Sequence, residues 1–291
     1  MKQIDVTIAL VHYKTPELLL TCLRSINQYT KIVNYEIIVA DNNSNDNSKQ
    51  LVAKYFPKVK FISNKKNLYA TGGNNQIYKL SKGNYFLVLN PDIEFFDDAI
   101  GKMKVFLDNN PNVAAVSCGQ YSKDENLHKV CSRFCTPLIE FWQNNLVGRY
   151  FQNKKAINRY LYSNWDRTTT KKVDVISDTI MLIRSSVASE LGLYDERLKL
   201  LYMENDLCMR IKKLDYSVYY LGSVKVKHHI GQSTKTLSPW EFYKIFDNDM
   251  LYYYSKYFNK VWVFFLWSTF KINKIYFLMN NLIYKFKKSS D

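Results

Sequence analysis

The sequence predicts an α/β fold built on a mostly parallel sheet that is flanked by helices. Short apolar runs rich in β-branched and aromatic residues recur along the first half of the chain, as buried parallel strands require. Segments with helix-start signals separate these runs, so strand and helix alternate. Two of the runs are followed by carboxylates, Asp41 and Asp92, at the strand ends where open α/β sheets bind ligands.

Each element of this first half has a local reason. Thr15 followed by Pro16 is a typical helix start, and the helix is expected to end near Asn27. The runs themselves are bounded by Asn, Pro and Gly, which are typical of strand ends. The expected strands cover residues 6–11, 37–40, 59–62, 85–89 and 113–118, and further helices are expected at 46–55, 71–80 and 97–108.

The second half is less regular. Residues 119–172 are polar and aromatic with little clear period, and a stretch of this length is usually functional or holds irregular helices. From Pro239 onward the pattern is helical, basic and aromatic. Between these two stretches we expect strands at 173–176, 180–183, 218–221 and 224–227, and a helix at 204–214.

Composition and charge limit the possible partners. The 291 residues, 47% of them hydrophobic, suffice for one large α/β domain with an appendage or for two small domains. The net charge of +15 favours anionic partners such as nucleotides, acidic membranes or nucleic acid. The 5 cysteines have no zinc spacing and are typical of reduced cytosolic thiols. We expect no signal peptide, and the apolar run 261–270 is too short to span a bilayer.

Asp41 and Asp92 are the first candidate ligand residues. A carboxylate just after a strand can accept a hydrogen bond from a nucleotide base or ribose, although Asp41 in Asp-Asn-Asn-Ser is also typical of a turn that caps the next helix. Asp92 follows Asn90 and Pro91, and Pro91 cannot continue a strand ladder. Because Mg²⁺ takes one or two carboxylates plus substrate phosphates, Asp92 is a candidate metal ligand, with a polar strand end as the alternative.

A small-residue turn supplies a candidate anion site. Gly72 and Gly73 allow close approach of a ligand to the backbone, and the N–H groups at a helix start suit an anion. The segment from Asn67 to Asn75 is neither a Walker loop nor a G-x-G-x-x-G fingerprint, so an ordinary helix start explains it as well.

Two further groups are candidates for chemistry. Glu204 and Asp206 stand at the start of an amphipathic helix, where acids either complement the helix dipole or act as a general base. His228 and His229 follow a short strand and point to opposite faces, so at most one of them serves a given site.

Taken in order, these motifs resemble family 2 glycosyltransferases, most closely their rhamnosyltransferase-like branch. The resemblance spans about residues 4–235. The motifs that carry it are Ile-Ile-Val-Ala-Asp41-Asn-Asn-Ser, Asn67-Leu-Tyr-Ala-Thr-Gly-Gly-Asn-Asn, Leu-Asn-Pro-Asp92, Met181-Leu-Ile-Arg, Gly192-Leu-Tyr-Asp195, Glu204-Asn-Asp206-Leu-Cys and His228-x-x-Gly231-x-Ser233.

The resemblance implies a GT-A fold and transfer of a sugar from a nucleotide-sugar with inversion at the anomeric carbon. It implies a GT-A domain over residues 1–235, with a nucleotide-binding half (1–118) and an acceptor-binding half (119–235). It gives Asp92 and His228 the role of ligands to a divalent metal, Mg²⁺ or Mn²⁺. The residues it assigns to the nucleotide pocket are Asp41, Asn67, Gly72, Gly73 and Asn74.

The chain departs from the family pattern at two places. The family usually has Glu-Asp-x-Asp-Leu-Cys, and aligned backward from Asp206-Leu-Cys the catalytic base is Glu204, with Asp206 as the alternative. The metal motif is Asn90-Pro91-Asp92 instead of a full Asp-x-Asp. Mechanistically, the resemblance implies a base that takes the acceptor's proton, and no covalent nucleophile.

The last segment, residues 236–291, is expected to form a basic aromatic helical tail. From 260 to 288 it lacks acids and combines aromatic residues with lysines, as in an interfacial helix on an anionic membrane. A cap on the core or a homodimer interface explains the pattern equally well. The lysines are Lys260, Lys271, Lys274, Lys285, Lys287 and Lys288.

The sequence therefore favours an inverting, metal-dependent glycosyltransferase of bacterial surface polysaccharide synthesis. We expect a UDP- or dTDP-sugar donor, a glycan or polyprenyl-linked acceptor, and a place on the inner face of the cytoplasmic membrane. A sugar-phosphate nucleotidyltransferase is the first alternative, but that class usually has a glycine-rich basic loop after strand one, where His12 and Tyr13 stand here. A nucleic-acid-binding protein is suggested by charge alone, and acids at the strand ends would repel its phosphates.

Overall fold

The computed structural model describes residues 3–229 and 238–288, with side chains described as far as Tyr276. Gly231 and Ser233, which belong to the His228 motif, therefore lie outside the described residues. The same holds for the side chains of Lys285, Lys287 and Lys288.

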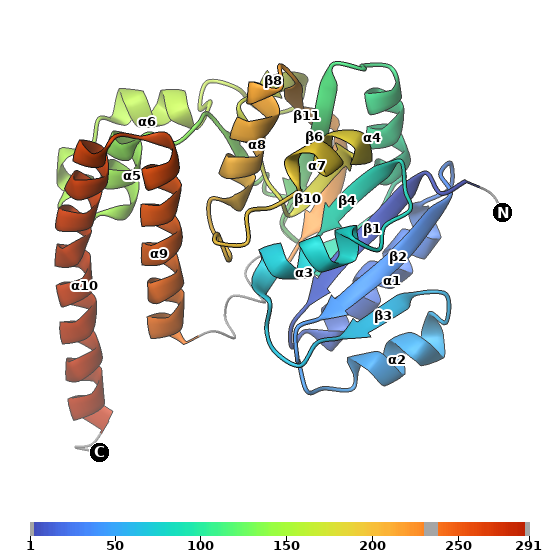
Figure 1. The fold of residues 1–291 in the computed structure, drawn as a ribbon, viewed down its shortest axis with the longest axis horizontal. Coiled ribbons are helices and arrows are strands. Elements are labelled where there is room, and N and C mark those ends of the chain that lie inside the picture. The colour runs from blue at the N-terminus through green and yellow to red at the C-terminus, as the bar shows by residue number, and fades with distance from the viewer. Residues whose placement is uncertain (1–2, 230–237, 289–291) are drawn as a thin grey trace.

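A nine-stranded mixed sheet forms the centre of the described structure (Figure 1). Its first half is parallel, in the order β3-β2-β1-β4. β1, β2 and β4 are apolar runs and are largely buried between helices on both faces, whereas β3, at the edge of the sheet, is partly exposed. These strands are β1 (Val6–His12), β2 (Tyr35–Asp41), β3 (Lys60–Ser63) and β4 (Tyr85–Leu89).

The second half of the sheet is mixed. β10 (Ile180–Arg184) lies antiparallel between β4 and β6 (Val113–Tyr121), so it interrupts the parallel order that the first half sets. β11 (Ser217–His228) runs parallel to β6 and antiparallel to β5 (Ile93–Glu94) and β8 (Thr170–Val173). A separate pair joins β7 (Cys131–Ser132) to β9 (Val175–Ile176).

Helices pack on both faces of the sheet and create two cores. On β1, Ile8 faces one core and its neighbour Ala9 faces the other, as the alternation of side chains along a strand requires. The first core contains α1 (Pro16–Tyr29), α2 (Ser48–Tyr55) and α4 (Ala99–Asp108). The second contains α3 (Tyr69–Tyr78), α7 (Ser185–Leu191) and α8 (Met203–Lys213). The predicted α/β class is thus confirmed.

The stretch 119–172, which the sequence left without an assignment, holds short helices and strands. They are α5 (Pro137–Asn144), the 3₁₀ helix η1 (Gly148–Phe151) and α6 (Lys154–Tyr160), in addition to β7 and β8. In Figure 1, α5 and α6 lie beside the C-terminal hairpin of α9 (Pro239–Tyr257) and α10 (Lys260–Lys288). No helix in the described residues is both long and apolar enough to cross a membrane.

The C-terminal hairpin shares a core with the rest of the protein. Met250, Tyr253 and Tyr254 of α9 are buried in the second core, together with Leu266 and Phe270 of α10. This part of the expected tail is therefore a cap on the core, one of the two explanations that the sequence left open. The division of residues 1–235 into two halves stays a prediction.

Three local expectations differ from the structure. α3 begins at Tyr69 instead of Thr71, because the Asn67 side chain accepts a hydrogen bond from the Tyr69 N–H at 2.7 Å. The strands expected at 218–221 and 224–227 are one strand, β11, with a bulge between Leu221 and Lys225. Conversely, the strand expected at 173–176 divides into β8 and β9.

Candidate active site

Sheet register brings the strand-end residues into one row. His12 of β1 pairs with Asp41 of β2, and Leu10 pairs with Leu89 of β4. Two residues beyond Leu10, His12 is therefore level with the turn that leads to Asp92. Because these strands are parallel, their carboxyl ends share one edge of the sheet, as the sequence predicted.

Asp92 faces His228 across this edge. His228 ends β11, and its Nε2 atom lies 3.5 Å from Asp92 Oδ1. His229 instead contacts Glu94, with 3.1 Å between Nε2 and Oε2, so the adjacent histidines serve different acids. The backbone N–H of His229 donates to the Asp92 carbonyl at 2.9 Å, which fixes the two segments together.

This pair fits a divalent cation. Asp92 is 5% exposed, and within the described residues Asp92 Oδ1 and His228 Nδ1 are buried without a hydrogen-bond partner. Buried polar atoms are nearly always partnered, so an orphaned carboxylate oxygen beside a histidine suits a missing ligand. No group of three or more His, Cys, Asp or Glu side chains able to hold a metal occurs in the part of the chain described here. A cation held by this pair would need substrate phosphates as further ligands.

Asp178 joins the same edge from an antiparallel strand, and the sequence did not predict it. Ile180 of β10 pairs with Leu89, and the Asn90 N–H donates to the Thr179 carbonyl at 2.8 Å. Asp178, one residue earlier, is therefore level with the turn before Asp92. Burial raises the pKa of Asp178, and the nearby His228 partly offsets this rise.

Glu204 is a further carboxylate, and Asp178 influences its charge. It stands in the first turn of α8 and lines a cavity of about 240 Å³ together with Ser132 and Tyr160. Burial raises the pKa of Glu204, and the negative charge of Asp178 raises it further. Asp92 contacts His228, His228 influences the charge of Asp178, and Asp178 influences that of Glu204; we call these four residues the acid–histidine row.

Asp206 has a different environment. Its side chain is fully buried, and three donors surround it: Arg210 Nε at 2.7 Å, Lys256 Nζ at 2.5 Å and the Tyr257 hydroxyl at 2.7 Å. Lys256 and Tyr257 belong to α9, so Asp206 ties α8 to the C-terminal hairpin. A carboxylate with its oxygens held this way is suited to support the helix.

The Asp41 carboxylate is partly engaged in hydrogen bonds within its own turn. Its carboxylate accepts hydrogen bonds from the backbone N–H of Ser44 and from the Ser44 hydroxyl. It therefore forms the turn that the sequence gave as the alternative to a ligand role. The backbone of Lys14, Asn43 and Tyr69 around this edge has positive φ values of 57°, 64° and 57°. Such strained conformations concentrate at ligand sites.

The residues expected to line the nucleotide pocket divide into two groups. Asn67 and Gly72 line a cavity of about 470 Å³ that Lys199 also borders. Gly73 faces away from it: a Cβ there would lie 2.8 Å from the Val11 side chain, so glycine is required for α3 to pack on β1. Asn74 is 4% exposed, and within the described residues its Oδ1 has no hydrogen-bond partner.

Two further residues were missed by the sequence analysis. Asp249 of α9 is buried, and its Oδ2 accepts from the N–H groups of residues 199, 200 and 201, at 3.0, 2.9 and 3.0 Å. It holds the loop that leads into α8. His128 packs its ring edge-on against His228, with centroids 5.9 Å apart. Neither has a local sequence signal, because both act on elements about 50 or more residues away.

Comparison with known proteins identifies the family. The family model described as "Glycosyl transferase family 2" matches residues 7–192, which is more than half of the chain. The chain belongs to glycosyl transferase family 2. The predicted resemblance to family 2 glycosyltransferases is thereby confirmed.

Two curated relatives of this family 2 glycosyltransferase are rhamnosyltransferases. An N-acetylglucosaminyl-diphospho-decaprenol L-rhamnosyltransferase of Mycobacterium tuberculosis is 24% identical over 210 residues, covering 68% of this chain and 67% of the relative. The rhamnosyltransferase WbbL of Escherichia coli is 22% identical over 210 residues, covering 69% and 75%.

Solved structures show the same fold at low identity. A mannosyltransferase of Pyrobaculum calidifontis, in complex with GDP-Man and Mn²⁺, superposes with a TM-score of 0.58 at 14% identity, covering 88% of this chain and 64% of that one. GalNAc-T7 with UDP, GalNAc and Mn²⁺ gives 0.61 at 12% identity, covering 86% and 47%. This family 2 glycosyltransferase therefore spans about half to two thirds of these two chains.

Proposed function

We propose that this protein is an inverting glycosyltransferase that moves a sugar from a nucleotide-diphosphate sugar to a lipid-linked or glycan acceptor. The acid–histidine row carries the proposal, because it joins a candidate metal pair at the sheet edge to Glu204, a half-buried carboxylate of α8 that lines a cavity. With the donor's diphosphate at Asp92 and His228, Glu204 remains free to contact the acceptor hydroxyl.

Glu204 is the proposed general base. It takes the proton of the acceptor hydroxyl, whose oxygen attacks the anomeric carbon opposite the nucleoside diphosphate. The new bond joins the acceptor oxygen to the anomeric carbon, the bond to the diphosphate oxygen breaks, and the nucleoside diphosphate leaves. One base suffices for inversion. The raised pKa of Glu204 supports the role, since a base with a pKa nearer the working pH accepts protons more effectively.

Asp92 and His228 would hold a divalent cation, Mg²⁺ or Mn²⁺. When bound, such a cation supplies positive charge that stabilises the leaving diphosphate. Asp92 needs no rearrangement for this, because its Oδ1 is already without a hydrogen-bond partner in the described structure. The Mn²⁺ in the mannosyltransferase and GalNAc-T7 structures supports the proposal.

Asp41, Asn67, Gly72 and Asn74 are the proposed nucleotide contacts, of which Asn67 and Gly72 border the cavity beside α3. Gly73 belongs to the same segment but would act through the packing of α3. A UDP- or dTDP-sugar is the proposed donor. The neighbouring Lys199 adds positive charge for a phosphate.

We place the activity at the cytoplasmic face of the membrane, in surface polysaccharide synthesis. The M. tuberculosis relative's name supports a polyprenyl diphosphate acceptor. Exposed Val261, Phe264 and Trp267 on α10, together with Lys260 and Lys271, support peripheral contact with an anionic membrane. A homodimer stays a prediction.

Thermal unfolding with added nucleotides tests the proposal. UDP, dTDP and GDP are each added with and without Mn²⁺. One nucleoside diphosphate should raise the Tm, and Mn²⁺ should increase that shift, because ligand at a hundred times its Kd contributes about 2.7 kcal/mol. If no nucleoside diphosphate raises the Tm under either condition, the proposed donor site is wrong.

A further inference from the structure

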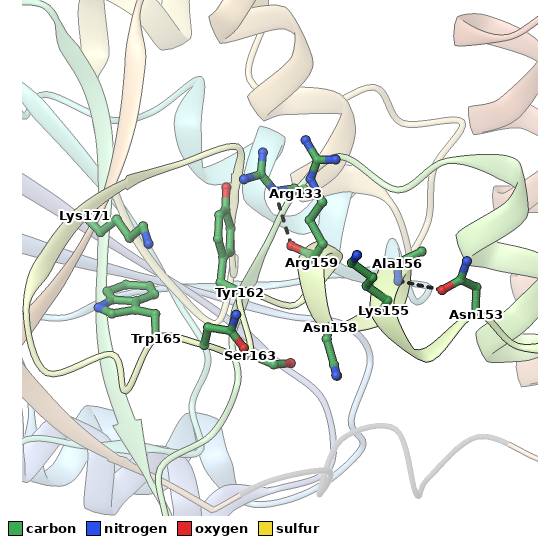
Figure 2. Close-up of a pocket in the computed structure, with 11 residues that line it drawn as sticks. Arg133, Asn153, Lys155, Ala156, Asn158, Arg159, Tyr162, Ser163, Trp165 and Lys171 are labelled. Carbon is green, nitrogen blue, oxygen red and sulfur yellow. Dashed lines mark hydrogen bonds between the residues drawn. The ribbon is translucent and has the colours of Figure 1, made fainter.

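A third cavity, of about 740 Å³, opens on the 119–172 stretch and is both basic and aromatic (Figure 2). Its charged side chains are Arg133, Lys155, Arg159 and Lys171, and its rings are those of Tyr162 and Trp165. No acidic residue is among the described residues that line it. We call it the basic pocket.

The positive charges of the basic pocket have no carboxylate partners. Across the part of the chain with described side chains, none of its four cationic groups forms an ion pair. Like charges gathered in one cavity repel each other unless an anion joins them, so the pocket is suited to an anionic ligand. Guanidinium and ammonium groups bind phosphate oxygens through short, charge-assisted hydrogen bonds.

Rings and backbone atoms hold these cations in place. Lys171 Nζ lies 4.8 Å from the Trp165 ring centre and 5.2 Å from that of Tyr162. The Arg133 guanidinium lies 5.0 Å from the Tyr162 ring centre, and its Nε donates to the Arg159 carbonyl at 3.2 Å (Figure 2). Contacts of this kind position the cations without neutralising them.

The basic pocket and the Glu204 cavity share a wall. Ser132 and Tyr160 line the Glu204 cavity, and their chain neighbours Arg133 and Arg159 line the basic pocket. The Arg133 N–H donates to the Tyr160 carbonyl at 2.9 Å, which joins the two segments. The two cavities are therefore neighbours, built from the same two chain segments around residues 131–133 and 159–162.

Exposed aromatic side chains precede the pocket residues closely along the chain. Tyr150 and Phe151 of η1 are 88% and 72% exposed, and the chain continues directly to the pocket residue Asn153. The segment is fastened to α10, since the Leu146 N–H donates to Asn273 Oδ1 at 2.9 Å. A soluble phosphate needs no such apolar border, whereas a lipid chain attached to a phosphate does.

We propose that the basic pocket binds the phosphate groups of a lipid-linked acceptor. This proposal rests on the proposed transferase function and deepens it by naming the acceptor subsite. It assigns Arg133, Arg159 and Lys171 to the acceptor's diphosphate, and it explains why the chain has cations here without acids.

The test measures binding of geranylgeranyl diphosphate by calorimetry in detergent, with excess UDP and Mn²⁺ present to fill the donor site. Arg133→Gln combined with Lys171→Gln should weaken binding about tenfold or more, since two charge-assisted contacts are lost. Lys172→Gln and Lys154→Gln are matched controls, because each residue neighbours a pocket lysine in sequence, is exposed and does not line the pocket. Both should bind like the wild type.

Three comparisons complete the test. Geranylgeraniol should not bind, and inorganic pyrophosphate should bind more weakly than the lipid diphosphate. The double variant should keep the wild-type affinity for UDP. If the wild type binds the lipid diphosphate through these residues but transfers no sugar from a UDP-, dTDP- or GDP-sugar to a lipid-linked acceptor that carries a sugar hydroxyl, the subsite stands and the proposed function fails.

Unchanged binding of geranylgeranyl diphosphate by the double variant would overturn the proposal. So would equal wild-type affinities for pyrophosphate and lipid diphosphate, which would indicate a soluble phosphate ligand. A third contrary result would come from the double variant. If it no longer bound phosphatidylglycerol vesicles but still bound the lipid diphosphate, the pocket would be assigned to membrane headgroups.

Discussion

Substitution of Glu204 and Asp206 separates catalysis from support at the start of α8. Glu204→Gln keeps the size of the side chain but cannot accept a proton. Its kcat should fall by roughly 10²–10⁴, the usual contribution of a general base, while donor binding stays intact. Because burial and Asp178 raise the pKa of Glu204, ionisation of Glu204 destabilises the folded state.

The sign of the stability change follows from that pKa. When the pKa of a carboxyl group is raised in the folded state, the protein's free energy of unfolding falls with rising pH. The fall begins near the unfolded pKa, about 4.5, and ends near the folded pKa. Glu204→Gln removes this loss, so its Tm at neutral pH should equal or exceed that of the wild type.

Asp206→Asn should do the opposite. Asp206 is fully buried among Arg210, Lys256 and Tyr257, and breaking a buried ion pair costs about 3–5 kcal/mol. Asn keeps one acceptor oxygen, so we take about 3 kcal/mol, which lowers the Tm of a domain of this size by roughly 6 °C. Differential scanning calorimetry and initial rates on both variants provide the readout.

The pH dependence gives an independent check. The wild-type kcat/KM should fall about tenfold per pH unit below the raised pKa of Glu204, and this acid limb should be absent in Glu204→Gln. The assignment is refuted if Asp206→Asn is stable and inactive with donor binding intact while Glu204→Gln turns over normally. The alignment of Glu204 with the family's catalytic base would then be off by two positions, and Glu204 and Asp206 would exchange roles.

Three further predictions concern the other proposed sites. Asp92→Ala should abolish Mn²⁺-dependent nucleoside diphosphate binding in calorimetry without changing the fold, and unchanged affinity would remove Asp92 from the metal role. Asp41→Ala should weaken nucleotide binding even without metal. The Asp41→Ala variant also loses the hydrogen bonds with Ser44, so Ser44→Ala is its control. If both variants bind the nucleotide as tightly as the wild type, Asp41 only forms the turn. Replacing Phe264 and Trp267 with Ser and Lys271 with Gln should release the protein from phosphatidylglycerol liposomes in co-sedimentation at low salt. These substitutions test the α10 surface better than truncation, which would also remove the buried Leu266 and Phe270. Failure of the wild type to bind the liposomes would refute membrane contact.

The strand-end residues could be predicted from sequence because they depend on local patterns. Buried runs give the strands, and parallel strands share an edge, so Asp41 and Asp92 fall in one row. Asp178 could not be predicted this way. It precedes β10, and no local pattern reveals that β10 inserts antiparallel between β4 and β6.

Other parts of the site depend on distant contacts. Glu204 and Asp206 look alike in sequence, and what distinguishes them is the burial of Asp206 by Lys256 and Tyr257 on α9. The sequence predicts Gly73 as a position of close ligand approach, whereas packing against the Val11 side chain explains the glycine. The basic pocket could not be predicted from the sequence, because its cations come from three separate segments that the fold of 119–172 brings together.

The anomeric configuration of the product tests the central claim most directly. Wild-type protein is incubated with Mn²⁺ and α-linked sugars of the nucleoside diphosphate selected by thermal unfolding. The first product is followed by proton NMR, with water as acceptor if no glycan acceptor reacts. One general base and no covalent nucleophile predict a product of β configuration, formed at least about a hundredfold more slowly by Glu204→Gln. A product that retains the α configuration would contradict the account.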